Sequence, residues 1–292
     1  MKLTTFTLNS VSRVGIITAH GIIDTLSLKQ LPASMPEFLT SYLDNPEYIG
    51  ELVNRNHTYI DIDAVKLEAP VPRPGKFLGI GLNYLDHIEE TGKDRPKTPT
   101  VFNKQITCVI GPGAPIHKPR VSEQLDYEGE LGFVIGKRCR HVPREQAHRV
   151  IAGYMAVNDV SVRDWQARTP TMTLGKSFDT HGPTGPWIVT SDEIGDPHKL
   201  DIKTRVNNGL RQSSNTRYLL FNCYDLVAYL STVFTLEPGD IISTGTSSGV
   251  GAKMQPPGFL QPGDVVTIEI EKIGLLSNPV IAEPEVNNIW VR

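Results

Sequence analysis

Glycine and proline recur in short clusters along the whole chain, and this spacing limits the length of any regular element. The sequence has 25 glycines and 22 prolines among its 292 residues. Frequent clusters of glycine and proline are typical of short strands joined by turns, and they disfavour a bundle of long helices. One longer segment, Tyr218–Thr235, has apolar residues at the helical period, and Pro238 and Gly239 follow it. Because strands and helices do not alternate regularly, the sequence predicts a β-rich α+β fold.

Shorter elements are predicted on both sides of the proline-rich segment APVPRPGKF. Prolines restrict the backbone and cannot donate to a ladder, so this segment predicts a boundary between a small N-terminal domain, residues 1–70, and a larger domain, residues 71–292. The predicted strands are Lys2–Leu8, Arg13–Thr18, Lys76–Gly81, Tyr127–Lys137, Tyr154–Asp159, Asp240–Thr244 and Val265–Glu271. The further predicted helices are Met35–Asp44, a short one in NYLDHIEETG, Pro143–Ile151 with Gly153 just past its end, and a turn Ser161–Arg168 with Ser161 as its N-cap.

Charge and apolar patterning exclude several classes of partner. The formal net charge is −3, so neither nucleic acid nor an anionic membrane surface would meet a basic field. No apolar run approaches the roughly 20 residues needed to cross a bilayer, and no leader-like apolar stretch is visible at the N-terminus. The cysteines Cys108, Cys139 and Cys223 form no CxxC pair and no zinc-type spacing, which favours packing residues in a reduced compartment. The sequence therefore predicts a cytoplasmic protein that binds neither nucleic acid nor membrane.

Two glutamates in the predicted strand Tyr127–Lys137 are the central chemical feature of the chain. Alternate side chains of a strand share a face, so Glu128 and Glu130 point the same way, while the apolar residues from Leu131 onward alternate into a core. Gly129 between them allows another segment to approach the backbone. Paired carboxylates repel, and a cation with oxygen ligands, Mg²⁺, Mn²⁺ or Ca²⁺, relieves that repulsion. Taken alone, this common pattern fits surface glutamates on an exposed strand edge better.

The segment VNDVSVRDWQ places further polar groups behind an apolar strand. Asp159 ends that strand, where a short carboxylate can project into a cleft. Arg163 and Gln166 are three residues apart, so they lie on one side of a helical turn. Arginine can bind a carboxylate through two parallel hydrogen bonds. An aspartate cap beside a surface arginine is the alternative interpretation.

His87 and Glu90, in GLNYLDHIEETG, are three residues apart and would be neighbours on a helix. A carboxylate beside a histidine orients the ring and raises its basicity. Such a pair can activate a water molecule by general-base catalysis. A surface helix with an incidental histidine fits the same spacing equally well.

Two later segments, LGKSFDTHGPTGP and ISTGTSSGVG, add polar groups without a specific pattern. Lys176, among small residues, could stabilise a developing enolate. The loop 242–251 offers backbone N–H groups and hydroxyls to an anion, although it lacks the GK[ST] ending of a P-loop. An ordinary surface lysine and a flexible turn are the alternatives.

In this order and spacing, these segments resemble the fumarylacetoacetate hydrolase family. The resemblance runs from about Pro72 to about Pro279. Its motifs are GLNYLDHIEE, FNK at 102–104, GPG at 111–113, DYEGELGFVIGK, GYMAVNDVSVRD, TLGKSFDTHGPTGPW, and TGTSSGVG followed by PGD. The resemblance implies a mixed-β roll that is usually a homodimer.

The resemblance also implies the roles of the site residues. These are metal binding by Glu128, Glu130 and Asp159, a catalytic dyad of His87 and Glu90 on a lid, an active-site lysine at Lys176, and substrate contacts at Arg163, Gln166, Gly245 and Thr246. Eukaryotic fumarylacetoacetases have a further aspartate ligand seven residues before the histidine, where this chain has Ile80. The resemblance therefore favours the bacterial-type branch and a substrate other than fumarylacetoacetate.

The function implied by the resemblance is hydrolysis of a carbon–carbon bond in a small β-diketo or 2-oxo acid of the acylpyruvate type. A divalent cation, Mg²⁺ with Mn²⁺ or Ca²⁺ as alternatives, would stabilise an enolate as a Lewis acid, and the dyad would activate water. Decarboxylation of oxaloacetate or another 2-oxo acid, and enol isomerisation, use the same chemistry and stay open. A non-catalytic metal-binding member of the family is disfavoured, because the carboxylates, the dyad, the lysine and the arginine are all present.

Overall fold

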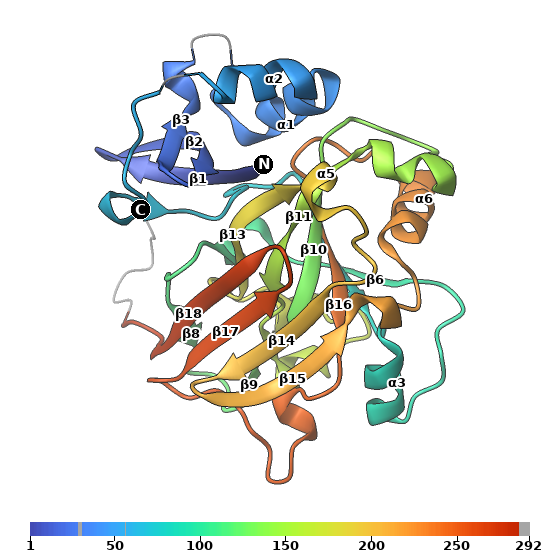
Figure 1. Ribbon diagram of the computed structural model, residues 1–292. Helices are drawn as coiled ribbons and strands as arrows, with labels where there is room; N and C mark the ends of the chain where they lie inside the picture. Colours follow the sequence, from blue (N-terminus) through green and yellow to red (C-terminus); the bar gives the residue numbers. More distant parts are fainter. Residues whose placement is uncertain (29–30, 56, 286–292) are drawn as a thin grey trace.

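The computed structural model describes residues 1–28, 31–55 and 57–285, which are arranged around two sheets (Figure 1). Within these residues the larger sheet has eleven strands, in the order β3-β2-β1-β13-β11-β10-β16-β5-β6, with β4 paired to β1 and β7 paired to β13. Its strands are β1 (Lys2–Leu8), β2 (Val11–Thr18), β3 (Gly21–Asp24), β4 (Lys66–Leu67), β5 (Phe77–Gly81), β6 (Thr100–Asn103), β7 (Val109–Ile110), β10 (Gly129–Ile135), β11 (Ile151–Asn158), β13 (Gly182–Thr190) and β16 (Ile241–Thr246).

A second sheet lies against the larger one, as the strands in front of β10 and β11 in Figure 1 show. Its five strands among the described residues have the order β15-β14-β17-β18-β8, and a separate short pair joins β9 to β12. These strands are β8 (Ile116–Lys118), β9 (Leu125–Asp126), β12 (Ser161–Val162), β14 (Asp201–Val206), β15 (Gly209–Asn215), β17 (Val265–Ile270) and β18 (Gly274–Ala282). The sheet-rich architecture confirms the predicted β-rich α+β class.

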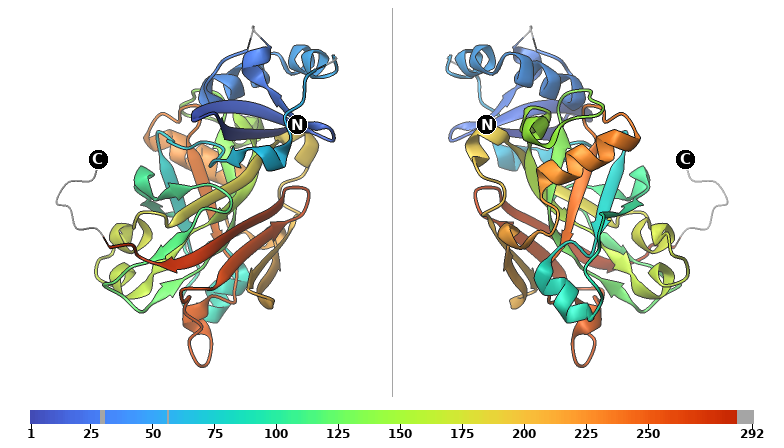
Figure 2. Two further views of the ribbon diagram at one scale, coloured as in Figure 1. Left: turned by 90° about the vertical axis from the view of Figure 1, so that its left-hand side faces the viewer. Right: turned by 90° about the vertical axis from the view of Figure 1, so that its right-hand side faces the viewer.

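Two groups of helices lie at opposite ends of the molecule. Figure 2 shows α1 and α2 at one end, and α3 beside the loop that holds η7 at the other. The α-helices are α1 (Met35–Asp44), α2 (Pro46–Val53), α3 (Leu85–Thr91), α4 (Arg163–Gln166), α5 (Ser191–Ile194) and α6 (Cys223–Val233). The 3₁₀ helices are η1 (Thr25–Ser27), η2 (Ile62–Ala64), η3 (Ile106–Cys108), η4 (Arg144–Arg149), η5 (Thr173–Lys176), η6 (Thr216–Tyr218) and η7 (Gly251–Lys253). Among the described residues, no helix has the length and apolar character needed to cross a membrane.

Strand β10 lies at the centre of the core and is buried along its whole length. Leu131, Phe133 and Ile135 pack on one face with Ile268 of β17, in the cluster between the two sheets. Val134 packs on the other face, in a cluster that includes apolar residues of α1. The predicted apolar face is therefore confirmed, and the face that carries the two glutamates is covered as well.

Residues 1–70 continue the larger sheet. Lys2 of β1 pairs with Val189 of β13, and Leu3 pairs with Ile188. Leu3 also shares an apolar cluster with residues of β10 and β11. The division into domains at residues 1–70 and 71–292 stays a prediction.

Most predicted elements are present, with ends that shift by a few residues. β1 and α1 have the predicted bounds. The strands predicted at 13–18, 76–81, 127–137, 154–159, 240–244 and 265–271 correspond to β2, β5, β10, β11, β16 and β17, and the short helix predicted in NYLDHIEETG is α3.

Two of the predicted helical segments are wrong in part. The segment 143–151 forms the 3₁₀ helix η4, and Gly153 lies inside β11 instead of ending a helix. A Cβ at Gly153 would come within 2.3 Å of the Val189 carbonyl oxygen, so the glycine allows close pairing with β13. Ser161 lies in β12 and its hydroxyl donates to the Asp159 carbonyl at 2.8 Å, so it does not cap α4, which begins at Arg163.

The long helix predicted over 218–235 begins later, as α6, at Cys223 and ends at Val233. The Asn222 side chain caps it in a reciprocal pair with Asp225. The preceding residues are held elsewhere, because the Leu220 N–H donates to the Asn83 carbonyl at 2.7 Å. The apolar periodicity of the sequence therefore begins several residues before the helix itself.

Candidate active site and metal centre

Three acidic side chains converge where β10 and β11 run side by side. Glu130 lies in β10 and Glu128 just before it, whereas Asp159 directly follows β11. Gly129 is opposite Asn158, and the Asp159 N–H donates to the Glu128 carbonyl at 2.9 Å. Each of the three buried side chains offers a carboxylate oxygen within 4.8 Å of the others.

Gly129 permits this arrangement because the second sheet crosses it at very short range. A Cβ at Gly129 would lie 2.0 Å from the Thr204 hydroxyl of β14. The Gly129 N–H donates to the Gln212 side-chain oxygen of β15 at 2.9 Å. The predicted approach of another segment at Gly129 is confirmed, and β14 and β15 supply it.

The carboxyl group of Glu130 carries the strongest sign that a cation belongs here. Burial, together with the nearby Asp159 and Glu128, raises the pKa of Glu130 well above its ordinary value. The same carboxylate accepts hydrogen bonds from the Ser243 hydroxyl at 2.5 Å and the Gly245 N–H at 2.8 Å. These donors do not outweigh the burial and the two neighbouring negative charges.

Glu128 has the opposite balance. Burial opposes its ionisation, but Lys176 and Arg163 outweigh burial and hold the pKa of Glu128 below its ordinary value. The Lys176 ammonium donates to Glu128 at 2.8 Å and to Asp159 at 2.7 Å. Burial alone would lower the pKa of Lys176, yet Asp159 and Glu128 raise it, so this lysine stays charged.

Lys104 is a second buried cation at the cluster, and sequence reasoning gave it no role. Its ammonium lies 2.6 Å from Asp159 and 2.5 Å from the Lys176 carbonyl oxygen. Both side chains of the Lys104–Asp159 pair are fully buried. Its one indication in the sequence is the motif FNK at 102–104. This motif is part of the family resemblance, which implies no function for Lys104.

The donor set fits a hard divalent cation. The group found among the described residues consists of carboxylates alone, without a thiol or an imidazole. Oxygen ligands suit Mg²⁺, Mn²⁺ or Ca²⁺. Burial and like charges raise the pKa of the Glu130 carboxyl group, and binding of such a cation would favour its ionised form. Glu128, Glu130 and Asp159 therefore fit a metal of this kind.

Arg163 has a guanidinium that is only partly satisfied by the protein. Its Nε donates to Asp126 at 2.8 Å, and its Nη1 donates to Glu128 at 2.6 Å and to the Gln166 side-chain oxygen at 3.0 Å. Burial would lower the pKa of Arg163, but Asp126 and Glu128 raise it. Its Nη2 is buried and has no partner among the described residues. The predicted proximity of Arg163 and Gln166 is confirmed, and the free Nη2 is suited to an anionic ligand.

Asp126 fixes this arginine, and sequence reasoning missed it. The carboxylate is fully buried and, besides Arg163, accepts from the backbone N–H groups of Gly251 at 2.8 Å and Ala252 at 2.9 Å. It therefore joins the arginine to the loop that follows β16. The residue stands two positions before Glu128 in DYEGE, but its partners lie far along the chain.

His87 and Glu90 form the expected pair on α3. The His87 Nδ1 lies 2.9 Å from the Glu90 carboxylate, and the other oxygen of Glu90 accepts from the Gly249 N–H at 2.8 Å. Asp86 accepts from the His87 N–H at 2.7 Å and from the Ser214 hydroxyl at 2.6 Å. Contacts from β15 and from the loop after β16 thus hold Asp86 and Glu90, which both hydrogen-bond to His87.

Gly245 and Thr246 end β16 beside Glu130. Gly245 has a φ of 98°, and a Cβ there would lie 2.8 Å from the Ile80 carbonyl oxygen. Its N–H is engaged by Glu130. Thr246 donates its hydroxyl to the Gly129 carbonyl at 3.0 Å and lines the cavity described below. Direct contact of either residue with substrate stays a prediction.

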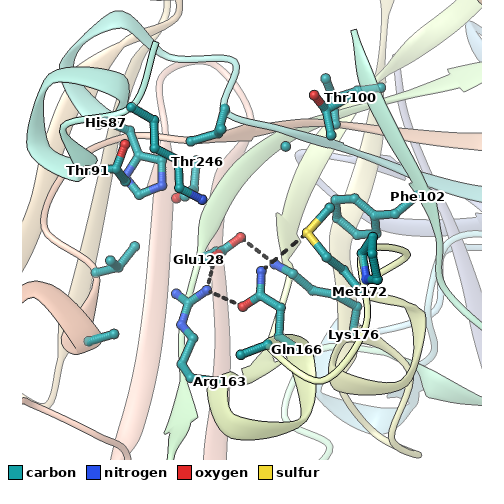
Figure 3. A pocket seen from close by; sticks show the side chains of 18 of the residues that line it. His87, Thr91, Thr100, Phe102, Glu128, Arg163, Gln166, Met172, Lys176 and Thr246 are labelled. Atoms are coloured by element: carbon teal, nitrogen blue, oxygen red, sulfur yellow. Dashed lines mark hydrogen bonds and ion pairs between the residues drawn. The ribbon is translucent and has the colours of Figure 1, made fainter. Parts of the chain in front are cut away.

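One cavity of about 620 Å³ brings most of these groups together (Figure 3). The expected site residues that line it are His87, Glu128, Arg163, Gln166, Lys176 and Thr246. In Figure 3, Glu128 lies between Arg163 and Lys176, and His87 lies beyond Glu128. Ile80, where the sequence resemblance implies a further aspartate ligand in the eukaryotic branch, is among the apolar lining residues.

Comparison with known proteins gives three kinds of match. A family model described as fumarylacetoacetate (FAA) hydrolase, C-terminal, matches residues 76–281. A mitochondrial oxaloacetate tautomerase of Xenopus laevis is 42% identical over 274 residues, which cover 92% of this chain and 86% of that protein.

Two of the similar solved structures are also enzymes. A maleylpyruvate hydrolase from Sphingobium sp. SYK-6, in complex with manganese(II) ion and pyruvate, has a TM-score of 0.81 and 32% identity, and the match covers 97% of this chain and 100% of that one. A 5-carboxymethyl-2-hydroxymuconate delta-isomerase from Mycobacterium smegmatis has a TM-score of 0.78 and 34% identity, with the same coverage.

Proposed function

This chain belongs to the fumarylacetoacetate hydrolase family and is an enzyme, and we propose that it hydrolyses a carbon–carbon bond in a small acylpyruvate-type diketo acid. One observation carries the proposal: His87, which is hydrogen-bonded to Glu90, lines the same cavity as Glu128, one of three clustered buried carboxylates. The first can move a proton, and the second fits a divalent cation.

The metal is proposed to be Mg²⁺, held by Glu128, Glu130 and Asp159, with Mn²⁺ or Ca²⁺ as alternatives. When bound, it would supply Lewis-acid stabilisation of negative charge that develops on a 2-oxo group. The manganese ion in the Sphingobium hydrolase supports a divalent cation in this fold. The protein residues around the cluster then account for binding and proton transfer.

Arg163 and Gln166 are proposed to bind the carboxylate of the 2-oxo acid. The Arg163 Nη2 is buried and unpartnered within the part of the chain that the structure describes, and the other guanidinium nitrogens are fixed by Asp126 and Glu128. A guanidinium held in this way loses little freedom when a carboxylate binds. Lys176, on the other side of Glu128, is proposed to stabilise negative charge during the reaction.

His87 is proposed to be the general base. Its Nδ1 is occupied by Glu90, so the ring takes the tautomer in which Nδ1 carries the proton and Nε2 has the free lone pair. Nε2 would remove a proton from water, whose oxygen attacks the carbonyl distal to the 2-oxo acid. The carbon–carbon bond then breaks, the distal fragment leaves as a carboxylic acid, and the enolate carbon takes up a proton to give pyruvate. Glu90 would stabilise the charged imidazolium between these transfers.

The test is to offer Mg²⁺-loaded enzyme acetylpyruvate, fumarylpyruvate and oxaloacetate in parallel, following ultraviolet absorbance and pyruvate. We expect a diketo acid to disappear with equal formation of pyruvate. The variant His87→Ala should lose this activity by about 10²–10⁴-fold while its metal affinity stays unchanged, because imidazole is not in the carboxylate cluster. Hydrolysis that persists in His87→Ala would remove the histidine from this role.

Oxaloacetate tautomerisation is the second candidate, favoured by the 42% identity with the Xenopus enzyme. The same residues would move a proton between the C3 carbon and the enol oxygen without attack by water. Loss of enol absorbance without pyruvate indicates tautomerisation, whereas loss of oxaloacetate with pyruvate indicates decarboxylation. A homodimer is also proposed, and the cytoplasmic location stays a prediction, since the similar Xenopus enzyme is named as mitochondrial.

A further inference from the structure

The outer part of the catalytic cavity is lined by cations that the proposed reaction does not use. Lys93, Arg168 and Lys253 all line this cavity and are all exposed. They come from three separate segments, namely the turn after α3, the residues after α4 and the end of η7. Glu128 is the one acidic residue among the lining side chains. Among the described lining residues, the rim of the cavity therefore carries positive charge without a compensating carboxylate.

These three cations are free to meet a ligand. Within the described part of the chain, neither Lys93 nor Lys253 makes an ion pair or a hydrogen bond through its ammonium group. The Arg168 guanidinium lies 3.7 Å from the centroid of the Trp165 ring. Stacking on an aromatic face leaves the edge of a guanidinium available for hydrogen bonds and restricts its motion. Arg168 is therefore preorganised, and the two lysines are mobile point charges.

The depth of the cavity determines which end of a substrate reaches the rim. Glu128 is 6% exposed and Lys176 is 2% exposed, so the reacting groups form the floor. A 2-oxo acid whose own carboxylate pairs with Arg163 has its 2-oxo group near this floor. Its other end extends toward the rim, where Lys93, Lys253 and Arg168 lie.

We infer that Lys93, Lys253 and Arg168 are specificity-determining residues that select 2-oxo acids with a second carboxylate at the distal end. The inference rests on the proposed function of the cavity and adds the residues that recognise the distal end of the substrate. A neutral distal group gains nothing from the three cations, whereas a carboxylate gains from each of them. Because exposed ion pairs are individually weak and screened by salt, the effect belongs to binding and to KM more than to the chemical step.

The turnover test compares two substrates that share the pyruvoyl end and differ at the other end, fumarylpyruvate and acetylpyruvate. In the double variant Lys93→Gln/Lys253→Gln, we expect the ratio of kcat/KM for fumarylpyruvate over acetylpyruvate to fall about fivefold to tenfold, through KM. Raising the salt concentration should lower the same ratio in the wild type. The control variant is Lys97→Gln, an exposed lysine on the same segment that does not line the cavity.

A binding test decides the inference even if the wild type turns over neither diketo acid. Calorimetry with Mg²⁺-loaded protein compares 2-oxoglutarate with 2-oxopentanoate, which have the same carbon chain and differ by the distal carboxylate. We expect the wild type and Lys97→Gln to prefer 2-oxoglutarate and the double variant to lose that preference. Normal turnover with an unchanged preference in the double variant would overturn the inference and leave the proposed function intact. Absence of turnover with a lost preference would reject the proposed function alone.

Discussion

Lys104 shows how much of the site depends on a single buried charge. Its ammonium contacts both the Asp159 carboxylate and the Lys176 carbonyl oxygen, so it orients one proposed metal ligand and the backbone of the proposed active-site lysine. An ion pair with both side chains fully buried is sensitive to loss of one partner, because Asp159 would then be balanced by Lys176 alone, which Glu128 shares. Lys104 therefore acts as a positioning residue in this account.

The variant Lys104→Met should lower the free energy of unfolding of EDTA-treated protein by about 3–5 kcal/mol. Denaturant unfolding measures this directly. The matched control is Lys199→Met, which removes the exposed 2.9 Å pair with Asp196 and should cost less than about 1 kcal/mol. The double variant Lys104→Met/Asp159→Asn should recover part of the lost stability, since the negative charge that Lys104 balanced is removed with it. Equal costs for the two single variants would contradict the role given to the buried pair.

Sequence patterns could predict those site residues whose neighbours are close along the chain. The alternation of a strand placed Glu128 and Glu130 on one face, and helical spacing placed His87 beside Glu90. Asp126 could not be assigned in this way, because its partners at Arg163 and in the loop after β16 are brought to it by the fold. Long-range partners of this kind leave no local periodicity.

At the scale of elements, the start of α6 was the least predictable boundary. The apolar period extends back to Leu219, but Asn222 caps the helix and the Asn83 side chain bonds the backbone of Phe221 through both its oxygen and its nitrogen. The Asn83 nitrogen also donates to the Thr244 carbonyl at 2.7 Å. The buried Asn83 side chain therefore ties the segment before α6 to β16. These tertiary contacts keep that segment out of the helix, although its apolar periodicity would extend the helix toward the N-terminus.

The variant Asn222→Ala should destabilise the protein by about 1 kcal/mol, because two helix N–H groups lose their side-chain acceptor. Thermal or denaturant unfolding gives the value. Asn222→Asp serves as the control, since aspartate is an equally good N-cap and should retain most of the stability. A loss as large in Asn222→Asp as in Asn222→Ala would show that the cap is not what stabilises this end.

At the scale of the whole molecule, the site lies where the second sheet covers a strand of the larger sheet that carries charged groups. β10 is buried along its length between β11 and β16, with β14 and β15 crossing at Gly129. The glycine and proline clusters, together with the lack of regular alternation between strands and helices, predicted the sheet-rich class. The pairing of β1 with β13 was not predictable, since strand order depends on contacts between residues almost 190 positions apart.

The central claim is that Glu128, Glu130 and Asp159 hold a divalent cation on which turnover of a 2-oxo acid depends. The most direct measurement is pyruvate release from acetylpyruvate by EDTA-treated protein as Mg²⁺ is added, for the wild type and for Glu130→Gln. We expect no release without metal, a saturable return of activity in the wild type, and a much weaker response in Glu130→Gln. Full activity in the presence of EDTA, or an identical Mg²⁺ dependence in Glu130→Gln, would contradict the claim.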